Sequence, residues 1–171
     1  TGACLGQEPQ DLKYRGADTQ VTIGNGNTIR ECVTINKATD EGEQTRIGDD
    51  NLLMAYCHLG HNCDLGNGIV MSNATQAAGH VVIEDKAVIG GCVGIHQFVH
   101  IGKMAMVGGM TRVDRDVPPY CLVEGHPGRI RSLNRVGLRR SGMTRNDSGQ
   151  EFKQLQELSL IHISEPTRPG H

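Results

Sequence analysis

Residues 47–113 read IGDDNL-LMAYCH-LGHNCD-LGNGIV-MSNATQ-AAGHVV-IEDKAV-IGGCVG-IHQFVH-IGKMAM-VGGMTR-V when the chain is divided every six residues. An apolar residue stands at every sixth position from Ile47 to Val113, and a second column four positions later holds small or β-branched residues such as Cys57 and Val93. A helix repeats about every 3.6 residues and an alternating strand every two, so a period of six indicates short, flat strands separated by corners. We therefore predict an all-β solenoid, a parallel β-helix of hexapeptide repeats in which three hexapeptides close one coil of about 18 residues.

The repeat has recognisable limits. Ile23, Ile29 and Ile35 keep the same phase upstream, and we interpret the polar stretch 38–46 as a loop that leaves one coil. The pair Pro118-Pro119 lacks the N–H groups that a strand needs, which predicts the end of the repeat. We predict the β-helix over residues 1–120, with further coils before Thr1, and the start of a helical domain over residues 121–158. Residues 159–171 resemble the translation of a sequencing adapter and are treated as a non-native tail.

Composition excludes several classes of protein. A net charge of -2 argues against a nucleic-acid-binding protein, which normally carries a basic excess. No apolar run approaches the roughly 20 residues of a membrane-spanning helix, so no membrane span is expected. The six Cys residues form no CxxC pair, which favours reduced thiols in a cytoplasmic protein.

Histidines gather where a passive solenoid would not need them. With a coil of about 18 residues, His61, Gly79 and Gln97 occupy equivalent positions on three successive coils, flanked by His80 and His96. His58 lies three residues before His61. An imidazole with its ordinary pKa of about 6.5 can accept a proton from a hydroxyl group at neutral pH. A single histidine is usually a polar surface residue, but this column predicts an active site.

A metal site is the alternative for part of this cluster, because Cys57, His58, His61 and Cys63 are all residue types that bind zinc. The two cysteines occupy the inward column, whereas the two histidines lie off it. The four side chains should therefore diverge, and we predict no metal.

Several segments resemble those of the UDP-N-acetylglucosamine O-acyltransferases that begin lipid A synthesis. The resemblance runs from the first residues to about Gly142, and several of its motifs are specific to these enzymes rather than to hexapeptide proteins at large. The matching segments are Gln10-Asp-Leu-Lys-Tyr14, Asp50-Asn-Leu-Leu-Met54, His58-Leu-Gly-His61, Ala78-Gly-His80, Ile95-His-Gln-Phe98, Asp116-Val-Pro-Pro-Tyr120 and residues 134–140.

The resemblance implies a left-handed coil, a homotrimer, and transfer of a 3-hydroxyacyl chain from acyl carrier protein to the 3-hydroxyl of UDP-N-acetylglucosamine, with no cofactor. It implies that His61 is the general base and that the Gly79 N–H holds the oxyanion. It places Gly109 at the far end of the acyl groove. Substrate-binding positions implied in the same way are Gln10, Asp11, Lys13, His58, His80, His96 and Gln97, with Asn134 and Arg140 toward the nucleotide.

Two positions depart from the family pattern. Asn62 stands where many relatives place an Asp beside the catalytic histidine, and Asn can orient the imidazole but cannot neutralise it. Val136 stands where some members use a carboxylate near the nucleotide, which puts nucleotide affinity in doubt.

Three other functions stay open at this point. One is the later N-acyltransferase of the same pathway, although Arg139-Arg140 after Asn134 and the Gln-Asp-Leu-Lys segment favour the O-acyltransferase. The second is a metal-dependent carbonic anhydrase-like trimer, which elemental analysis would reveal. The third is a non-catalytic trimeric scaffold, in which replacing His61 would have no effect.

Overall fold

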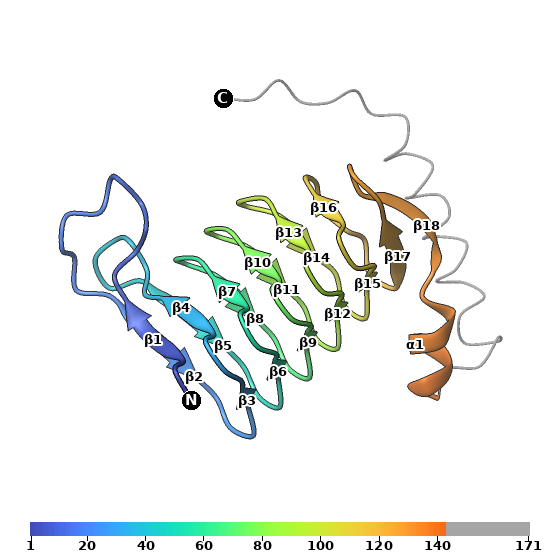
Figure 1. Ribbon diagram of the computed structural model, residues 1–171, viewed down its shortest axis with the longest axis horizontal. Helices are drawn as coiled ribbons and strands as arrows, with labels where there is room; N and C mark the ends of the chain where they lie inside the picture. Colours follow the sequence, from blue (N-terminus) through green and yellow to red (C-terminus); the bar gives the residue numbers. More distant parts are fainter. Residues whose placement is uncertain (143–171) are drawn as a thin grey trace.

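The computed structural model describes residues 1–142, and they form a left-handed parallel β-helix whose triangular coils stack along one axis (Figure 1). Each coil contributes one short strand to each of three parallel sheets, here called A, B and C. Sheet A contains β1 (Cys4–Gln7), β4 (Thr34–Asn36), β7 (His58–Leu59), β10 (Gln76–Ala77), β13 (Gly94–Ile95) and β16 (Arg112–Val113). Sheet B contains β2 (Gln20–Ile23), β5 (Gln44–Ile47), β8 (Asp64–Leu65), β11 (Val82–Ile83) and β14 (His100–Ile101).

Sheet C closes the triangle and ends in a hairpin. It contains β3 (Thr28–Ile29), β6 (Leu52–Leu53), β9 (Val70–Met71), β12 (Val88–Ile89), β15 (Met106–Val107), β17 (Cys121–Glu124) and β18 (Arg129–Leu133). Strand β18 is antiparallel to β17, and the short helix α1 (Arg135–Arg140) follows it. Within residues 1–142, no helix is long and apolar enough to cross a membrane.

The two columns of the hexapeptide repeat form the core. In sheet A, for example, Leu59, Ala77 and Ile95 lie in register on successive coils, and all three are buried. The small-residue column is buried as well, with Cys57 and Val93 fully enclosed. Because identical positions stack, each coil supplies the apolar floor for the next, which is why the period is visible in the sequence.

The corners depend on residues in the left-handed region of backbone space. Asn62, His80 and Phe98 follow one another at a single corner with φ angles of 59°, 59° and 63°. Neighbouring coils are joined there by backbone hydrogen bonds, such as the one that the His80 N–H donates to the His61 carbonyl at 2.9 Å. These bonds offset the cost of a left-handed non-glycine residue and fix the corner in place.

Three details differ from the sequence-based expectations. The loop predicted over residues 38–46 is shorter, because β5 begins at Gln44. The next residue, Thr45, is buried. The repeat does not stop at Pro118-Pro119, since β17 pairs in parallel with β15. Residues 121–133 are mainly strand, so the described part of the predicted helical domain is helical only in α1. The remainder of 121–158 and the tail 159–171 lie outside the described residues.

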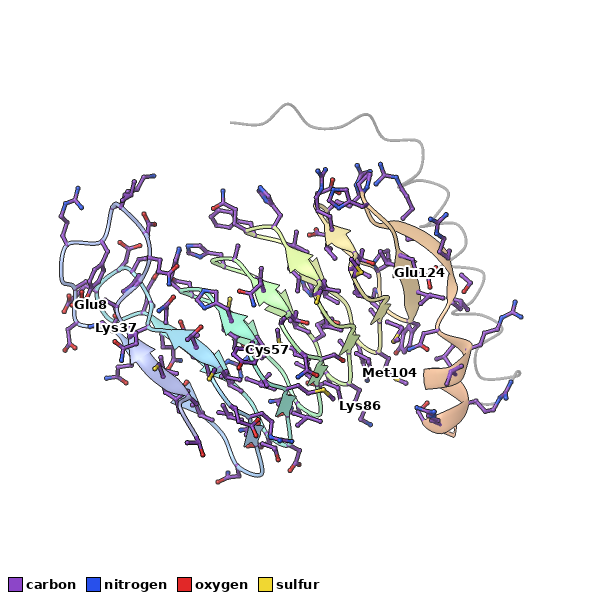
Figure 2. All side chains as sticks on the ribbon, viewed as in Figure 1. Glu8, Lys37, Cys57, Lys86, Met104 and Glu124 are labelled. Carbon is purple, nitrogen blue, oxygen red and sulfur yellow. The ribbon has the colours of Figure 1, made fainter. Side chains whose placement is uncertain are left out.

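Two loops near the N-terminal end of the stack are clamped together, and both leave the coils on the same side (Figure 1). They cover residues 8–19 and 37–43. The Asp18 N–H donates to the Glu41 carboxylate at 2.9 Å, and the Gly42 N–H donates to the Asp18 carbonyl at 3.0 Å. The Lys37 ammonium lies 5.5 Å from the centre of the Tyr14 ring, and Figure 2 shows Lys37 beside the first of these loops. The clamp fixes both loops against the first coils.

Candidate active site

A cleft of about 930 Å³ runs along the outer face of sheet A. Its floor follows one column of the sheet, because His58, Gln76, Gly94 and Arg112 lie in register on successive strands. The corner between sheets A and B forms one wall. The residues that line the cleft are Gln10, Asn36, His58, Gly60, His61, Gln76, Ala77, Ala78, Gly79, Gly94, Ile95, His96, Gln97, Arg112, Val113 and Asp114.

His61 stands on this wall with contacts to both of its ring nitrogens. Nδ1 lies 2.9 Å from Asn62 Oδ1, and Nε2 lies 3.9 Å from Asp11 Oδ2. The side chain is 17% exposed, so it is held by its neighbours while one edge faces the cleft. The His80 ring meets it edge-on with 5.0 Å between the ring centres, and His80 in turn stacks on Phe98 at 4.5 Å. The imidazole is therefore fixed on three sides.

Gly79 provides the space that the His61 ring occupies. A Cβ atom at this position would lie 2.5 Å from both Cε1 and Nε2 of His61, too close for any side chain. Within residues 1–142, the Gly79 N–H donates to no backbone or side-chain acceptor. A buried donor beside a histidine in a cleft is suited to a developing negative charge.

The two neighbouring histidines are biased toward the neutral form. Burial lowers the pKa of His58, whose Nδ1 lies 2.7 Å from the Thr34 hydroxyl. Burial also lowers the pKa of His80, and the nearby His61 acts in the same direction. Neutral imidazoles can accept hydrogen bonds from hydroxyl groups.

The structure brings together most of the predicted site residues. Gln10, His58, His61, Gly79, His96 and Gln97 line one cleft, while Asp11 and His80 contact His61 directly. Lys13 does not line the cleft; its backbone N–H instead donates to the Asp11 carboxylate at 2.8 Å and fixes that loop.

Four other residues of interest lie outside the lining of this cleft. Asn134 and Arg140 belong to the α1 region, at the C-terminal end of the stack, whereas β7 lies in its middle (Figure 1). The Asn134 amide is already used, because it accepts from the Gly137 N–H and donates to the Met104 carbonyl, both at 2.9 Å. Val136 is exposed on α1. Gly109 lies at the corner between sheets C and A, outside the lining of the cleft.

Sequence reasoning missed part of the floor and part of the support of His61. Gln76, Gly94 and Arg112 follow His58 at the spacing of one coil, so the same step that connects His61, Gly79 and Gln97 would have found them. The side chains of Thr39 and Glu43, which contact Asn62, come from the loop 37–43. No periodic signal marks those two.

The alternative metal site is not formed within this part of the chain. Cys57 and Cys63 are fully buried, whereas His58 and His61 face the cleft, so the four side chains point in different directions (Figure 2 labels Cys57). Across residues 1–142, no group of three or more His, Cys, Asp or Glu side chains is arranged to hold a metal ion.

Known proteins are similar to this chain over most of its length. The acyl-[acyl-carrier-protein]–UDP-N-acetylglucosamine O-acyltransferase of a Synechocystis strain is 60% identical over 146 residues, which are 85% of this chain and 53% of that protein. The solved structure of the Arabidopsis UDP-N-acetylglucosamine acyltransferase aligns with a TM-score of 0.86 and 40% identity, covering 99% of this chain and 58% of that one. The chain thus spans about half the length of the curated relatives it matches.

Two further similarities concern nearly the whole chain and its C-terminal part. The solved structure of the UDP-N-acetylglucosamine acyltransferase from Bacteroides fragilis aligns with a TM-score of 0.86 and 34% identity, covering 98% of this chain and 70% of that one. The family model described as UDP N-acetylglucosamine O-acyltransferase, domain 2, matches residues 116–158. With the repeat, the cleft and the His61 corner in place, the chain belongs to the UDP-N-acetylglucosamine O-acyltransferase family.

Proposed function

We propose that this protein transfers a 3-hydroxyacyl chain from acyl carrier protein to the 3-hydroxyl of UDP-N-acetylglucosamine, the first step of lipid A synthesis. The observation that carries the proposal is the pairing of His61 with Gly79 in one cleft. The ring nitrogen Nε2 faces the cleft, and the Gly79 N–H is available beside it.

In this mechanism His61 Nε2 removes the proton of the sugar hydroxyl as its oxygen attacks the thioester carbonyl. The carbonyl oxygen then carries negative charge, which the Gly79 N–H stabilises. Collapse of the tetrahedral intermediate expels the carrier thiolate, and the His61 imidazolium returns the proton to that sulfur. The reaction needs neither a metal nor a covalent acyl-enzyme.

The remaining residues of the cleft would position the two substrates. Gln10, Asp11 and Lys13 belong to one clamped loop above His61, and His58, His80, His96 and Gln97 offer hydrogen-bonding side chains on successive coils. We assign the far end of the acyl groove to Gly109 because its outer side is open: a Cβ there would approach only the Gly91 backbone, at 3.4 Å.

A homotrimer would explain why the residues assigned to the nucleotide do not line the cleft of the same chain. In one protomer, Asn134 and Arg140 belong to the α1 region at the C-terminal end of the stack and do not line the cleft, whereas His61 follows β7 in the middle of the stack (Figure 1). A neighbouring protomer could bring its own α1 region to the cleft. We therefore propose a trimer with shared sites, working in the cytoplasm. Because the Asn134 amide is occupied within the protomer, Arg140 is the better candidate for a contact with the diphosphate.

The other functions are less well supported. The relatives are named as O-acyltransferases, which does not favour the N-acyltransferase or the carbonic anhydrase-like trimer. A scaffold would not require a glycine whose absent side chain makes room for a histidine.

Replacement of His61 by Ala tests the proposal. Loss of a general base should lower the rate of acyl transfer by roughly 10² to 10⁴-fold, with little change in unfolding, since the side chain lies at the surface of the cleft. Transfer from 3-hydroxyacyl carrier protein to UDP-N-acetylglucosamine is the measurement. His100→Ala is the matched control, because His100 is an exposed histidine on sheet B paired with Glu84. If His61→Ala kept more than about a tenth of the rate, the assignment would be wrong.

A further inference from the structure

The amide of Asn62 is the centre of a hydrogen-bond network that joins His61 to the loop 37–43. Its oxygen Oδ1 accepts from the Thr39 N–H and the Thr39 hydroxyl, both at 3.1 Å, and lies 2.9 Å from His61 Nδ1. Its nitrogen Nδ2 donates to the Glu43 carboxylate. The backbone of Asn62 is also held, because its N–H donates to the Thr45 hydroxyl at 2.9 Å.

These partners leave only one sensible orientation for the Asn62 amide. A backbone N–H such as that of Thr39 can only donate, so it must face the amide oxygen. An ionised carboxylate such as that of Glu43 can only accept, so it must face the amide nitrogen. A flipped amide would place donor against donor at Thr39 and acceptor against acceptor at Glu43.

The orientation of the amide fixes the tautomer of the imidazole. Because Asn62 Oδ1 is an acceptor, the neutral His61 ring must carry its proton on Nδ1. Its lone pair then lies on Nε2, the nitrogen that points toward the cleft and Asp11. The reverse tautomer would present an N–H to the substrate hydroxyl and could not act as a base.

We propose that Glu43 is a positioning residue that acts through Asn62 to hold His61 in the tautomer with a basic Nε2. The inference rests on the proposed function, in which His61 is the general base. The Glu43 carboxylate comes from the loop 37–43 and contacts the Asn62 amide, which in turn contacts the His61 ring. The amide itself carries no charge. The backbone of Glu43 is held by β2, since the Gln20 N–H donates to the Glu43 carbonyl at 3.2 Å.

Replacements of Glu43 in the full chain test this role. Glu43→Ala should lower kcat about tenfold, while KM for UDP-N-acetylglucosamine changes less than about twofold, because chemistry rather than binding is affected. Glu43→Gln should keep at least about half of the wild-type kcat, since its carbonyl can still accept from Asn62. Glu41→Ala is the matched control: Glu41 holds the same loop through the Asp18 N–H but does not contact Asn62.

A second measurement reports the tautomer without relying on activity. Nitrogen NMR of selectively labelled histidine distinguishes the protonated ring nitrogen of His61 from the unprotonated one. We expect Nδ1–H in the wild type and in Glu43→Gln, and a larger share of Nε2–H in Glu43→Ala.

The outcomes separate this inference from the proposed function. An unchanged tautomer and kcat in Glu43→Ala would overturn the role of Glu43, as would an equal loss of kcat in Glu41→Ala or in Glu43→Gln. If His61→Ala instead kept its rate while the tautomer still followed Glu43, the network would stand and the proposed function would fail.

Discussion

Two corners of the same coil use the same position of the hexapeptide in opposite ways. At the corner between sheets B and C, Asp49, Asn67 and Asp85 occupy successive coils, and each side chain accepts from the backbone N–H at that position in the preceding coil at 2.6 to 2.8 Å. At the corner between sheets A and B, the equivalent positions hold His61, Gly79 and Gln97. Within the described chain, the Gly79 N–H makes no such bond.

The two corners share the same position of the repeat, but the side chains of one serve stability, whereas those of the other leave groups free for chemistry. A ladder of Asp and Asn side chains accepts hydrogen bonds from the backbone N–H groups and so leaves none of those groups free for a ligand. Where Gly79 interrupts that ladder, its missing side chain leaves room for the His61 imidazole. Within residues 1–142 the Gly79 N–H is open because the Gln97 side chain of the next coil does not accept from it. A solenoid can thus create a site where the stabilising side chains of one corner are left out, which costs little when the coils above and below are intact.

A side chain at position 79 should disturb the corner at His61 more than any other change considered below. In Gly79→Ala the new Cβ would lie 2.5 Å from the His61 ring, so the imidazole must move by at least several tenths of an ångström. Misplacement of a catalytic group on that scale costs on the order of 10²-fold in rate. Measured kcat should fall by about that factor while the Tm changes little. A variant with wild-type kcat would show that His61 is not the base or that the corner yields easily.

Most of the fold was predictable because the apolar columns stack in register, so each coil requires apolar residues at the same positions of the repeat. The period identified Leu59, Ala77 and Ile95 as core, and they are buried. It failed at Gln44 and beyond Pro118-Pro119, where the strands continue without the repeat's usual spacing.

The candidate site was less predictable where it depends on loops. Equivalent positions on the coils predicted His61 beside Gly79, since one coil spacing relates them. The clamp that brings Asp11 and Glu43 toward His61 depends on contacts between two loops far apart in sequence. Periodicity carries no information about such contacts.

Changing Asn62 to Asp sharpens the comparison by making the corner at His61 resemble the acidic one. The new side chain would have no N–H to donate to Glu43, and two carboxylates would meet where an amide now joins them. We expect kcat at neutral pH to fall about tenfold, since the loop must shift to relieve the repulsion. Transfer assays across pH are the measurement.

The double variant Asn62→Asp with Glu43→Gln should restore the rate to within about threefold of wild type, because the introduced amide can donate to the introduced carboxylate. The acidic limb of its kcat/KM profile should move to higher pH, since a carboxylate now faces the imidazolium of His61. Asp11 and His80 also face His61, with Asp40 near His80, and none of them changes between the variants. Additive effects of the two substitutions would contradict a direct contact between Asn62 and Glu43.

Removing a rung from the structural corner should affect stability alone. In Asp85→Ala the Asn67 N–H loses an acceptor at 2.8 Å, which should lower the free energy of unfolding by about 1 kcal/mol. Denaturant unfolding measures this loss, and the transfer rate of the folded protein should equal that of the wild type. A fall in kcat comparable with that of Gly79→Ala would mean that the two corners are not independent.

The smallest expected effect is a pH dependence of stability that comes from His58. Burial lowers its pKa below the ordinary value of 6.5, and the cause of this shift is desolvation rather than a neighbouring charge. As pH falls through 6.5, the unfolded chain takes up a proton at this residue while the folded chain does not, so the folded state loses stability. The loss ends once pH has fallen below the lowered pKa. His80 shifts in the same direction, with His61, Glu43, Asp40 and Asp11 around it, and contributes to the same acid sensitivity. Denaturant midpoints at pH 7.5 and 5.5 should therefore differ less in His58→Gln than in the wild type, because Gln keeps a polar group near Thr34 but does not titrate. Equal differences in the two proteins would show that His58 is as accessible to protons in the fold as in the unfolded chain.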